Sequence, residues 1–492
     1  MPLSMNEPLP VPGEVKALHK TLLDKGYQAY LVGGCVRDIL LHREPKDWDI
    51  TTNAKPEEIQ ALFSETFYEN DFGTVGVVTE STNPRTKVIE MTPFREEGKY
   101  TNARHPDDIQ WADTLDADLK RRDFTINAIA YDPSTNTLVD LHGGQRDLEK
   151  KLLVTVGDAK ERFSEDALRM LRAIRLSAEL DFALDGNTAA AIAECAPLLQ
   201  KISAERVRDE LIRVLESDRP MQALYVAQKL GILKYMLPEL EEGIGIKQNQ
   251  AHSFEVFEHS LRTLQHAADK KWPLDVRIAA MLHDVGKPES RRWSDEKNDW
   301  TFYGHDVIGA RIAKNVLTRL KFPKEVIDIV TTLVRWHMFF SDPDKITLSA
   351  VRRVVARVGT DHIMDLLNLR VCDRIGTGRP KEHPFRLRKY MSMVDEAMRD
   401  PISVSMLKID GKGIMALGEA PGPKIGAVLH ALLEEVLDDP SRNTEEYLTK
   451  KAREFLALNE EDLFALGKQG KNRVENEEEE AVRLLREKHH VR

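Results

Sequence analysis

Two glycines and two spaced aspartates lie close together near the start of the chain. An apolar run ends in Gly33-Gly34, a stretch with Arg37 follows, and the segment closes on Asp47 and Asp49. Side chains alternate between the two faces of a strand, so both aspartates are expected to point the same way. Paired carboxylates repel unless a cation lies between them, and hard oxygen ligands suit Mg²⁺. Glycines ahead of a helix let backbone N–H groups approach phosphate, so the segment predicts a metal-bound nucleoside triphosphate.

The order of these features is more specific than any one of them, because Gly-Gly turns and isolated aspartate pairs are common in loops. Strand, Gly-Gly, helix and spaced aspartates in this order resemble the signature of the polymerase-β-like nucleotidyltransferases. Within them, the segment resembles the bacterial tRNA nucleotidyltransferase/poly(A) polymerase family. The resemblance implies Mg²⁺ at Asp47, Asp49 and Glu90, and a triphosphate held by Gly34 and Arg37. Glu90 lies in the β-like run KVIEM, so an ordinary edge-strand charge is the alternative.

A second segment carries the resemblance further along the chain. The stretch FREEGKYTNARHPDD, with DLKRRDFTINA after it, resembles the flexible loop and following motif of CCA-adding enzymes. The aromatic Tyr100 fits that pattern, whereas Asn102 stands where an aspartate is common. The resemblance implies that Arg122 contacts the triphosphate while Asp123 and Asn127 hold the turn. A charged cluster at the start of a helix is the alternative, because charged first turns are common.

Residues 165 to 175 read EDALRMLRAIR and predict an amphipathic helix. Asp166, Arg169, Arg172 and Arg175 recur every third residue, which makes Asp166 and Arg169 neighbours on such a helix. A surface Asp–Arg pair is common and weak, so the pattern alone favours an ordinary ion pair. The motif EDxxR nevertheless resembles the base-selecting motif of CCA-adding enzymes.

Donor and acceptor chemistry is consistent with that role. An ionised aspartate only accepts hydrogen bonds and an arginine only donates them. Cytosine and adenine each offer an amino donor beside a ring acceptor, whereas guanine and uracil offer the reverse. Asp166 and Arg169 together therefore fit C and A, and Arg172 and Arg175 are expected to support the pair or the phosphates.

A histidine-rich block follows, with the order H…HD…D on predicted helices. It resembles the HD-domain metal phosphohydrolases, and this resemblance implies metal ligands at His259, His283, Asp284 and Asp373. His305 and His337 fall where two-metal HD domains carry further ligands, with a hydrogen-bonded core histidine as the alternative for each. Imidazole and carboxylate ligands suit Mn²⁺, Ni²⁺, Fe²⁺ or Zn²⁺. Hydrolysis of phosphate-terminated or cyclic RNA ends would follow, although the domain could instead bind metal without turnover. His252 is expected to support the metal ligands or to face the substrate.

The last third contains a turn feeding a helix, APGPKIGAVLHALLEEVL, similar to the tail of CCA-adding enzymes. Backbone N–H groups from Gly422 to Gly426 could meet an RNA phosphate, and a plain turn between helices is the alternative. Lys450, Lys451 and Arg453 could add a basic strip for the tRNA elbow.

The bulk properties agree with a soluble protein of several domains. The 492 residues predict about three or four domains. No apolar run approaches the roughly 20 residues that span a bilayer, and the N-terminus lacks a signal-peptide core. The three cysteines have no CxxC spacing, which predicts reduced thiols and a cytoplasmic protein. The net charge of −10 leaves only local basic patches to bind nucleic acid.

Together these features predict an α+β fold: a polymerase-β-like palm with a mixed sheet, followed by an all-helical neck, an HD-type body and a tail. Short β-rich runs end by about residue 145, and the later period is almost wholly helical. The predicted domains are the palm at 14–145, the neck at 146–240, the body at 241–395, the tail at 396–465 and a charged extension at 466–492.

The resemblance implies CCA addition to tRNA from CTP and ATP, by a monomer or homodimer without membrane contact. Four alternatives stay open at this point. They are a poly(A) polymerase, an enzyme adding only CC or only A, a chain acting mainly as an HD phosphohydrolase, and a tRNA-binding module without catalysis.

Overall fold

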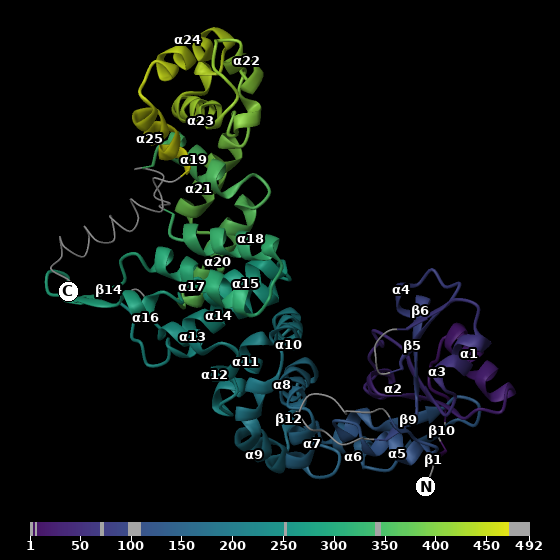
Figure 1. Cartoon of the computed structure of the whole chain (residues 1–492). Helices are drawn as coiled ribbons and strands as arrows, with labels where there is room; N and C mark the ends of the chain where they lie inside the picture. Colours follow the sequence, from purple (N-terminus) through teal and green to yellow (C-terminus); the bar gives the residue numbers. More distant parts are fainter. Residues whose placement is uncertain are drawn as a thin grey trace. The chain divides into compact units, whose positions relative to one another are not determined.

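The computed structural model describes residues 3–4, 7–68, 73–96, 110–249, 253–339 and 346–471 (Figure 1). They form two compact units, which meet in the sequence between Met236 and Leu237. Tyr100, Asn102 and His252 lie outside the described residues, as does most of the predicted extension. Within the described part, no helix combines the length and the apolar character needed to cross a membrane.

A mixed sheet of eight strands forms the core of the first unit, in the order β1-β10-β9-β2-β3-β6-β5-β4. Its strands are β1 (Leu3–Ser4), β2 (Ala29–Val32), β3 (Asp49–Thr52), β4 (Thr66–Tyr68), β5 (Val75–Val78), β6 (Val88–Pro93), β9 (Ile129–Asp132) and β10 (Thr137–Asp140). The neighbours β3 and β6 run parallel, and the other pairs run antiparallel. The predicted mixed sheet is confirmed, and the runs YLVGG, TVGVVTE and KVIEM supply β2, β5 and β6.

Alternating burial explains why these short segments form strands. Along β6, Ile89, Met91 and Pro93 are buried while the residues between them are partly exposed. One face of the central strands therefore packs into an apolar core that includes Val32 and Phe94, and the other face is left for polar side chains. Asp49, the first residue of β3, and Asp47, two residues before it, lie at the end of this sheet where β2 ends.

Helices complete the first unit, with two small strand pairs. They are α1 (Gly13–Asp24), α2 (Gly34–Leu40), α3 (Pro56–Leu62), α4 (Pro84–Lys87), α5 (Leu115–Lys120), α6 (Gly144–Glu149), α7 (Ala159–Glu165), α8 (Leu168–Leu180), α9 (Gly186–Cys195), α10 (Ala204–Glu216), α11 (Pro220–Lys229) and α12 (Leu233–Met236), with 3-10 turns η1 (Thr125–Asn127) and η2 (Ala196–Lys201). The pairs are β7 (Arg95–Glu96) with β8 (Gln110–Trp111), and β11 (Leu152–Leu153) with β12 (Ala183–Leu184).

The prediction of one helix over residues 165 to 175 is wrong. The chain leaves α7 at Asp166, whose φ of −139° and ψ of 104° are extended, and re-enters a helix at Leu168. The Asp166 carboxylate accepts a hydrogen bond from the Leu168 N–H at 3.0 Å, and this short-range bond competes with helix continuation. Asp166 therefore lies in the junction between two helices, while Arg169 lies in the first turn of α8.

The second unit is helical apart from a hairpin of β13 (Arg292–Ser294) and β14 (Asp299–Thr301). Its helices are α13 (Pro238–Glu241), α14 (Val256–Asp269), α15 (Leu274–Leu282), α16 (Lys287–Ser290), α17 (His305–Arg319), α18 (Lys324–Trp336), α19 (Leu348–Val358), α20 (Ile363–Gly376), α21 (Phe385–Ala397), α22 (Gly411–Met415), α23 (Pro423–Asp438), α24 (Glu445–Leu456) and α25 (Glu460–Lys471), with 3-10 turns η3 (Val404–Met406) and η4 (Pro440–Arg442). The hairpin and the pair β11–β12 are the short strands in a region that is otherwise helical within the described residues, as the almost wholly helical pattern from about residue 146 predicted.

The helix α15 is at the centre of the second unit, and seven consecutive residues of it, from Val276 to Leu282, are buried. It packs against α14, α18 and α20, so the polar residues that follow its end are fixed by a surrounding core. A separate apolar cluster holds α22 to α25 together in the yellow-green part of Figure 1.

A buried ion pair joins α8 to α10 in the first unit. The Arg175 guanidinium is buried, and its Nε donates to Glu210 Oε2 at 2.8 Å while its Nη1 donates to Glu179 Oε2 at 2.9 Å. Nucleotide contact by Arg175, as predicted from the sequence, would require these ion pairs to break.

We expect Arg175→Met to lower the thermal midpoint of the full chain. Two glutamates lose their partner inside the protein, and breaking a buried ion pair from one side costs about 3–5 kcal/mol. Lys20→Met is the control, because Lys20 pairs with Asp24 on the exposed surface of α1 and surface pairs contribute little. Circular dichroism on heating measures both variants, and equal midpoints would contradict a structural role for Arg175.

Candidate functional site

Three predicted carboxylates meet at one end of the sheet in the first unit. The parallel pairing of β3 with β6 places Asp49 directly opposite Glu90, which confirms the predicted position of Glu90 beside the aspartate strand. Gly33 has a φ of 79°, and a Cβ there would lie 3.3 Å from Arg122 Nη1 and 3.5 Å from Asp49 Oδ2. A side chain at Gly33 would therefore be strained by its backbone and crowd the site.

The next glycine meets the other half of the predicted set. A Cβ at Gly34 would lie 3.7 Å from Arg37 Nη2 and 3.8 Å from Asp47 Oδ1. The Gly-Gly turn thus lies against two aspartates and two arginines that are far apart in the sequence. The carboxylates supply the negative side of a site and the guanidiniums the positive side, which suits a metal-bound polyphosphate.

The electrostatics of Asp49 support a cation at this place. Burial raises the pKa of Asp49, and the neighbouring Glu90 and Asp47 raise it further, to about 7, against the lowering by Arg122 and Arg37. Three carboxylates this close are best stabilised by a divalent cation with oxygen ligands. The donor set therefore fits the divalent metal that nucleotidyltransferases of this family use.

Hydrogen bonds connect Arg37 to the neck in a continuous chain. Its Nη1 donates to Asn127 Oδ1 at 2.8 Å, and Asn127 Nδ2 donates to Asp123 Oδ1 at 3.2 Å. The other oxygen of Asp123 accepts from Arg172 Nε at 2.8 Å. Burial alone would raise the pKa of Asp123, but Arg172 holds it at about 2. The predicted role of Asp123 and Asn127 in holding the turn is confirmed.

Arg122 is held by a carboxylate that the sequence reasoning did not single out. Asp118 is fully buried, and its Oδ2 accepts from Arg122 Nη2 at 3.0 Å and from the Thr51 hydroxyl at 3.1 Å. Its Oδ1 accepts from Arg121 Nε at 2.9 Å. Burial alone would raise the pKa of Asp118, but Arg122 and Arg121 lower it to about 2. The signal was present in the sequence, since Asp118 precedes Arg122 by one helical turn.

The predicted base readers each have another partner. Asp166 Oδ2 accepts from Arg206 Nη2 of α10 at 2.7 Å. Arg169 Nη1 donates to Glu165 Oε2 at 2.7 Å, and its Nη2 donates to the Arg121 carbonyl at 3.2 Å. A base that takes up hydrogen bonds from Asp166 and Arg169 would have to share or replace these contacts. Their base-reading role stays a prediction, and Glu165 and Arg206 are additional charges in the same place.

The predicted ligands of the second unit meet in its interior. His283, His305 and His337 each bind, through Nδ1, the backbone carbonyl three residues earlier, at 2.9, 2.7 and 2.6 Å. A hydrogen at Nδ1 leaves the Nε2 lone pair of each ring for a metal. The histidine rings are therefore fixed in the tautomer that a metal site requires.

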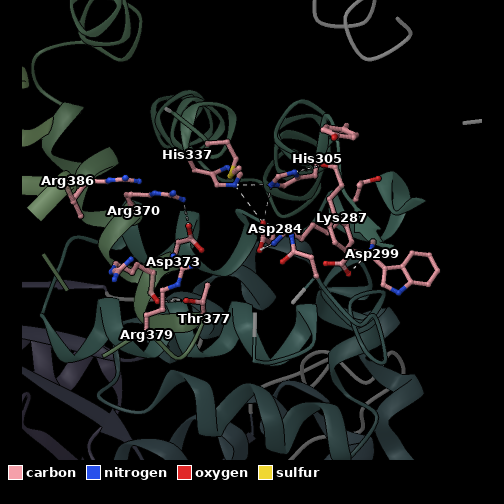
Figure 2. Close-up of a pocket in the computed structure, with 18 of the residues that line it drawn as sticks. Asp284, Lys287, Asp299, His305, His337, Arg370, Asp373, Thr377, Arg379 and Arg386 are labelled. Carbon is pink, nitrogen blue, oxygen red and sulfur yellow. Dashed lines mark hydrogen bonds and ion pairs between the residues drawn. The ribbon is translucent and has the colours of Figure 1, made fainter. Parts of the chain in front are cut away.

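Asp284 lies between two sets of ligands. Its Oδ2 is 3.1 Å from His259 Nε2 and 3.2 Å from His283 Nε2. Its Oδ1 is 3.4 Å from His305 Nε2 and 3.7 Å from His337 Nε2 (Figure 2). The described part of the chain contains two groups of three possible metal ligands, and within each group the donor atoms lie within 4.8 Å of one another. The first group is His259, His283 and Asp373, and the second is Asp284, His305 and His337. The arrangement has room for two ions, with one Asp284 oxygen facing each.

Close backbone packing brings the two ligand sets together. Gly286 follows the His-Asp pair, and a Cβ there would overlap the backbone of His305 and Gly309 in α17. Only glycine allows the turn after α15 to lie against the start of α17. The motif HDVGKP therefore needs its glycine to place Asp284 beside His305.

Charges around the ligands keep the carboxylates ionised. Burial alone would raise the pKa of Asp284, but His283 and Lys287 hold it well below its usual range. Lys287 Nζ donates to Asp284 Oδ2 at 2.6 Å, and Arg370 Nη1 donates to Asp373 Oδ2 at 2.6 Å. The sequence reasoning missed Lys287, although it lies three residues after Asp284 in the same motif.

The histidines have unequal proton affinities. Burial lowers the pKa of His259, but Asp284 and Asp373 raise it to about 9, whereas burial leaves the pKa of His337 well below its ordinary value. The first ligand set therefore holds a proton at neutral pH that a divalent cation displaces on binding. Imidazole and carboxylate donors in this number suit a transition metal.

A cavity of about 840 Å³ opens onto Asp284, His305, His337 and Asp373. Arginines line one side of it in Figure 2, where Arg370, Arg379 and Arg386 lie on the side of Asp373. Asp299, of the hairpin β13–β14, lies on the opposite side of Asp284. The cavity is large enough for a nucleotide and brings it within reach of both ligand sets.

The predicted tail residues lie at the start of α23 and along α24. Gly422 immediately precedes α23, and Lys424 of its first turn pairs with Glu460 at 3.1 Å. Lys450 and Arg453 share a shallow surface with Glu445, Glu446 and Glu454, so carboxylates interrupt the expected basic strip. Phosphate binding by this turn stays a prediction.

Three protein families match consecutive parts of the chain. The family described as "Poly A polymerase head domain" matches residues 29–154, and "Probable RNA and SrmB-binding site of polymerase A" matches residues 181–244. The HD domain family matches residues 256–372. The first covers every strand of the sheet except β1, with the three carboxylates. The last covers every predicted ligand of the second unit except Asp373.

Curated relatives cover most of the chain. The CC-adding tRNA nucleotidyltransferase of Thermus thermophilus is 34% identical over 82% of this chain and 89% of that protein. The CCA-adding enzyme of Geobacillus thermodenitrificans is 32% identical over 86% of this chain and 91% of that protein. Among solved structures, the Bacillus stearothermophilus CCA-adding enzyme in complex with CTP has a TM-score of 0.68 and 27% identity, covering 90% of this chain and 98% of that one.

We expect the second unit to bind two transition-metal ions, and Asp284→Ala to lose both. Each oxygen of Asp284 faces a different ligand set, so its removal weakens both sites, whereas His337→Ala should lose one ion. Metal analysis after incubation with Mn²⁺ or Ni²⁺ and gel filtration measures the stoichiometry. Asp299→Ala is the matched control, because Asp299 lines the cavity outside both ligand sets. Loss of a single ion in Asp284→Ala would contradict the shared position of this carboxylate.

Proposed function

Since the chain belongs to the tRNA nucleotidyltransferase/poly(A) polymerase family, we propose that it adds the sequence CCA to the 3′ end of tRNA. The CCA-adding enzyme of Geobacillus thermodenitrificans, which supports this activity, aligns along 86% of the chain. The observation that carries the proposal in this chain itself is the meeting of Asp47, Asp49, Arg37 and Arg122 around the Gly-Gly turn.

In the proposed reaction, the tRNA 3′-hydroxyl attacks the α-phosphate of CTP twice and of ATP once, and pyrophosphate leaves each time. Asp47, Asp49 and Glu90 would hold Mg²⁺, which lowers the pKa of the hydroxyl and neutralises the departing pyrophosphate. Arg37 and Arg122 would bind the triphosphate with Gly34, because their guanidiniums are already oriented by Asn127 and Asp118.

Base choice would rest on Asp166 and Arg169. Hydrogen-bonding chemistry supports this pair: Asp166 can accept a hydrogen bond from the amino group of C or A, and Arg169 can donate one to the ring nitrogen beside it. Arg206 and Glu165, which bind these two side chains before a base arrives, would keep their charges balanced. The continuous contact of Asp123 with Arg172 and Asn127 joins this place to the proposed triphosphate site.

The partners of this reaction are tRNA, CTP and ATP, and the proposal places it in the cytoplasm, as a monomer or homodimer. The turn at Gly422 and the residues Lys450, Lys451 and Arg453 are the proposed contacts of the second unit with the tRNA backbone. Their positive charges suit phosphate, although neighbouring glutamates limit the strength of that surface.

Addition of CC alone is the second candidate, because a CC-adding nucleotidyltransferase is among the relatives. Residues 97–109, which carry RHP and Asn102, lie outside the described residues. The intact sequence of this stretch favours CCA addition, since the resemblance implies that enzymes adding only CC lack much of the loop.

The decisive experiment gives the purified chain a labelled tRNA that lacks its CCA end. We expect growth by two nucleotides with CTP, by three with CTP and ATP, and no growth with GTP or UTP. Asp49→Ala is the control that assigns the activity to the first unit, because it removes a proposed Mg²⁺ ligand there and leaves the second unit unchanged. Arrest at two nucleotides with both substrates would mean a CC-adding enzyme, and a long ladder with ATP alone would mean a poly(A) polymerase.

A second activity is favoured by the two ligand sets that share Asp284. We infer a metal-dependent phosphohydrolase that removes a terminal phosphate from an RNA end. A water oxygen forms a bond to phosphorus, the bond from phosphorus to the ribose oxygen breaks, and that oxygen takes a proton, which leaves a hydroxyl end and inorganic phosphate. Lys287 and Arg370, which bind Asp284 and Asp373, would fix the ligands and balance their charge.

We expect Asp118→Asn to raise the KM for CTP. Arg122 donates a hydrogen bond to the fully buried Asp118 carboxylate, and the substitution removes the charge of that acceptor. Such a charge-assisted bond is worth about 1.5–3 kcal/mol, so kcat/KM should fall about 10- to 100-fold. Initial rates over a range of CTP concentrations separate KM from kcat. The control Asp140→Asn changes a carboxylate that caps α6, and it should leave KM unchanged. A loss confined to kcat would contradict positioning of Arg122 by Asp118.

A further inference from the structure

The cavity of the second unit has two unlike walls on either side of Asp284. One wall comes from the end of α20, the following loop and the start of α21, and the other comes from the hairpin β13–β14 and the segment that joins it to α17. A cavity for a bare phosphate would need only the ligands and one or two cations. The two walls extend beyond the metal ligands, so the cavity fits a substrate larger than a phosphate ion.

The first wall is cationic. Its arginines are Arg370, Arg374, Arg379 and Arg386. Arg370 is engaged by Asp373, whereas Arg374 donates through Nε to the Lys381 carbonyl at 2.6 Å, which fixes the plane of its guanidinium. Arg379 is exposed on the loop after α20. Arginines gathered at the edge of a cavity repel one another unless an anion binds between them, and phosphate is the anion that guanidinium forks match.

The second wall is aromatic. Trp300 of β14 lines the cavity together with Tyr303. Arg291 lies over the Trp300 ring at 3.6 Å from its centroid, and Trp293 meets the same ring edge-on at 5.2 Å. These two contacts hold Trp300 in one orientation at the cavity wall. Phe385, at the start of α21, adds a ring that is 67% exposed at the opening.

Aromatic rings combined with a cationic track are the features that bind single-stranded nucleic acid. A mononucleotide has one phosphate and one base, so it can occupy the metal ligands and one ring but leaves the arginine wall without an anion. A duplex is too wide for a cavity of about 840 Å³. The two walls together fit the last two nucleotides of a single strand.

We propose that this cavity binds a phosphate-terminated oligonucleotide of at least two nucleotides. Its terminal phosphate faces Asp284, a base stacks on Trp300 or Tyr303, and the next phosphodiester binds Arg374 and Arg379. The proposal rests on the phosphohydrolase activity proposed above for the same cavity, and it names the class of substrate. Arg379 and Arg374 then determine specificity for a strand over a free nucleotide.

The test measures binding, with ligands that cannot be hydrolysed because a methylene group replaces the 3′ oxygen of the terminal phosphate. The full chain, loaded with Mn²⁺, is titrated calorimetrically with the mononucleotide and with the dinucleotide. We expect the dinucleotide to bind at least about tenfold more tightly, since one guanidinium–phosphate contact is worth about 1.5–3 kcal/mol. In Arg379→Gln this preference should fall severalfold, because only Arg374 then contacts the second phosphate, with the mononucleotide affinity unchanged.

Two further variants complete the test. Arg388→Gln is the matched control, because Arg388 lies on α21 and binds the His383 carbonyl away from the cavity, so it should retain the preference. Trp300→Leu should lower the affinity for both the mononucleotide and the dinucleotide, because both would stack a base on Trp300. The dependence of dinucleotide affinity on salt should also be less steep in Arg379→Gln, by about one phosphate contact.

Equal affinity of the wild type for both ligands would overturn the proposal. A nucleoside 3′,5′-bisphosphate that binds as tightly as the dinucleotide would also overturn it, in favour of a small polyphosphate. Release of inorganic phosphate from a 3′-phosphorylated dinucleotide is followed separately. A preference for the dinucleotide without phosphate release would leave the binding proposal in place and refute the phosphohydrolase activity.

Discussion

Clustered carboxylates that need positive charge organise both units of this chain. In the first unit, Asp49 lies beside Glu90 and Asp47, and desolvation together with repulsion from these two groups raises its pKa to about 7. In the second, Asp284 and Asp373 lie among histidines. Folding brings these like charges together at a cost, which only paired or hydrogen-bonded counter-charges and bound cations offset. The cationic residues around the sites follow from this constraint.

Two further buried aspartates are neutralised by arginine side chains and not by a metal ion. Asp118 and Asp123 are buried, and their arginine partners hold the pKa of each at about 2, against the effect of burial. The same bonds hold Arg122 beside the Gly-Gly turn and bind Arg172 of α8 to Asp123. A structural requirement and a functional one are thus met by the same contacts, because a guanidinium fixed in advance loses little freedom when a phosphate binds.

In the second unit, a buried helix, α15, fixes the position of the carboxylate and histidine that follow it. The residues of α15 are buried almost throughout, so the His-Asp turn at its end cannot move without disturbing the core. Backbone carbonyls fix the rings of His283, His305 and His337, and the absence of a side chain at Gly286 allows α17 to approach. The cavity beside this rigid centre is lined by a loop and a hairpin, which are the elements that can vary with the substrate.

Strand and helix periods and short motifs are local properties, so the mixed sheet, the helical remainder and the candidate residues that meet at both sites were predictable from the sequence. It placed Glu90 beside the aspartate strand and grouped the histidines correctly. It failed at Asp166, where a side chain to backbone bond interrupts the expected helix, and it did not find Asp118 or the arginine wall of the cavity. Only the tertiary structure decided these points, since the partner of a charged side chain is chosen by packing between segments distant in the sequence. Spacing along one helix cannot reveal that Asp166 binds Arg206, forty residues later.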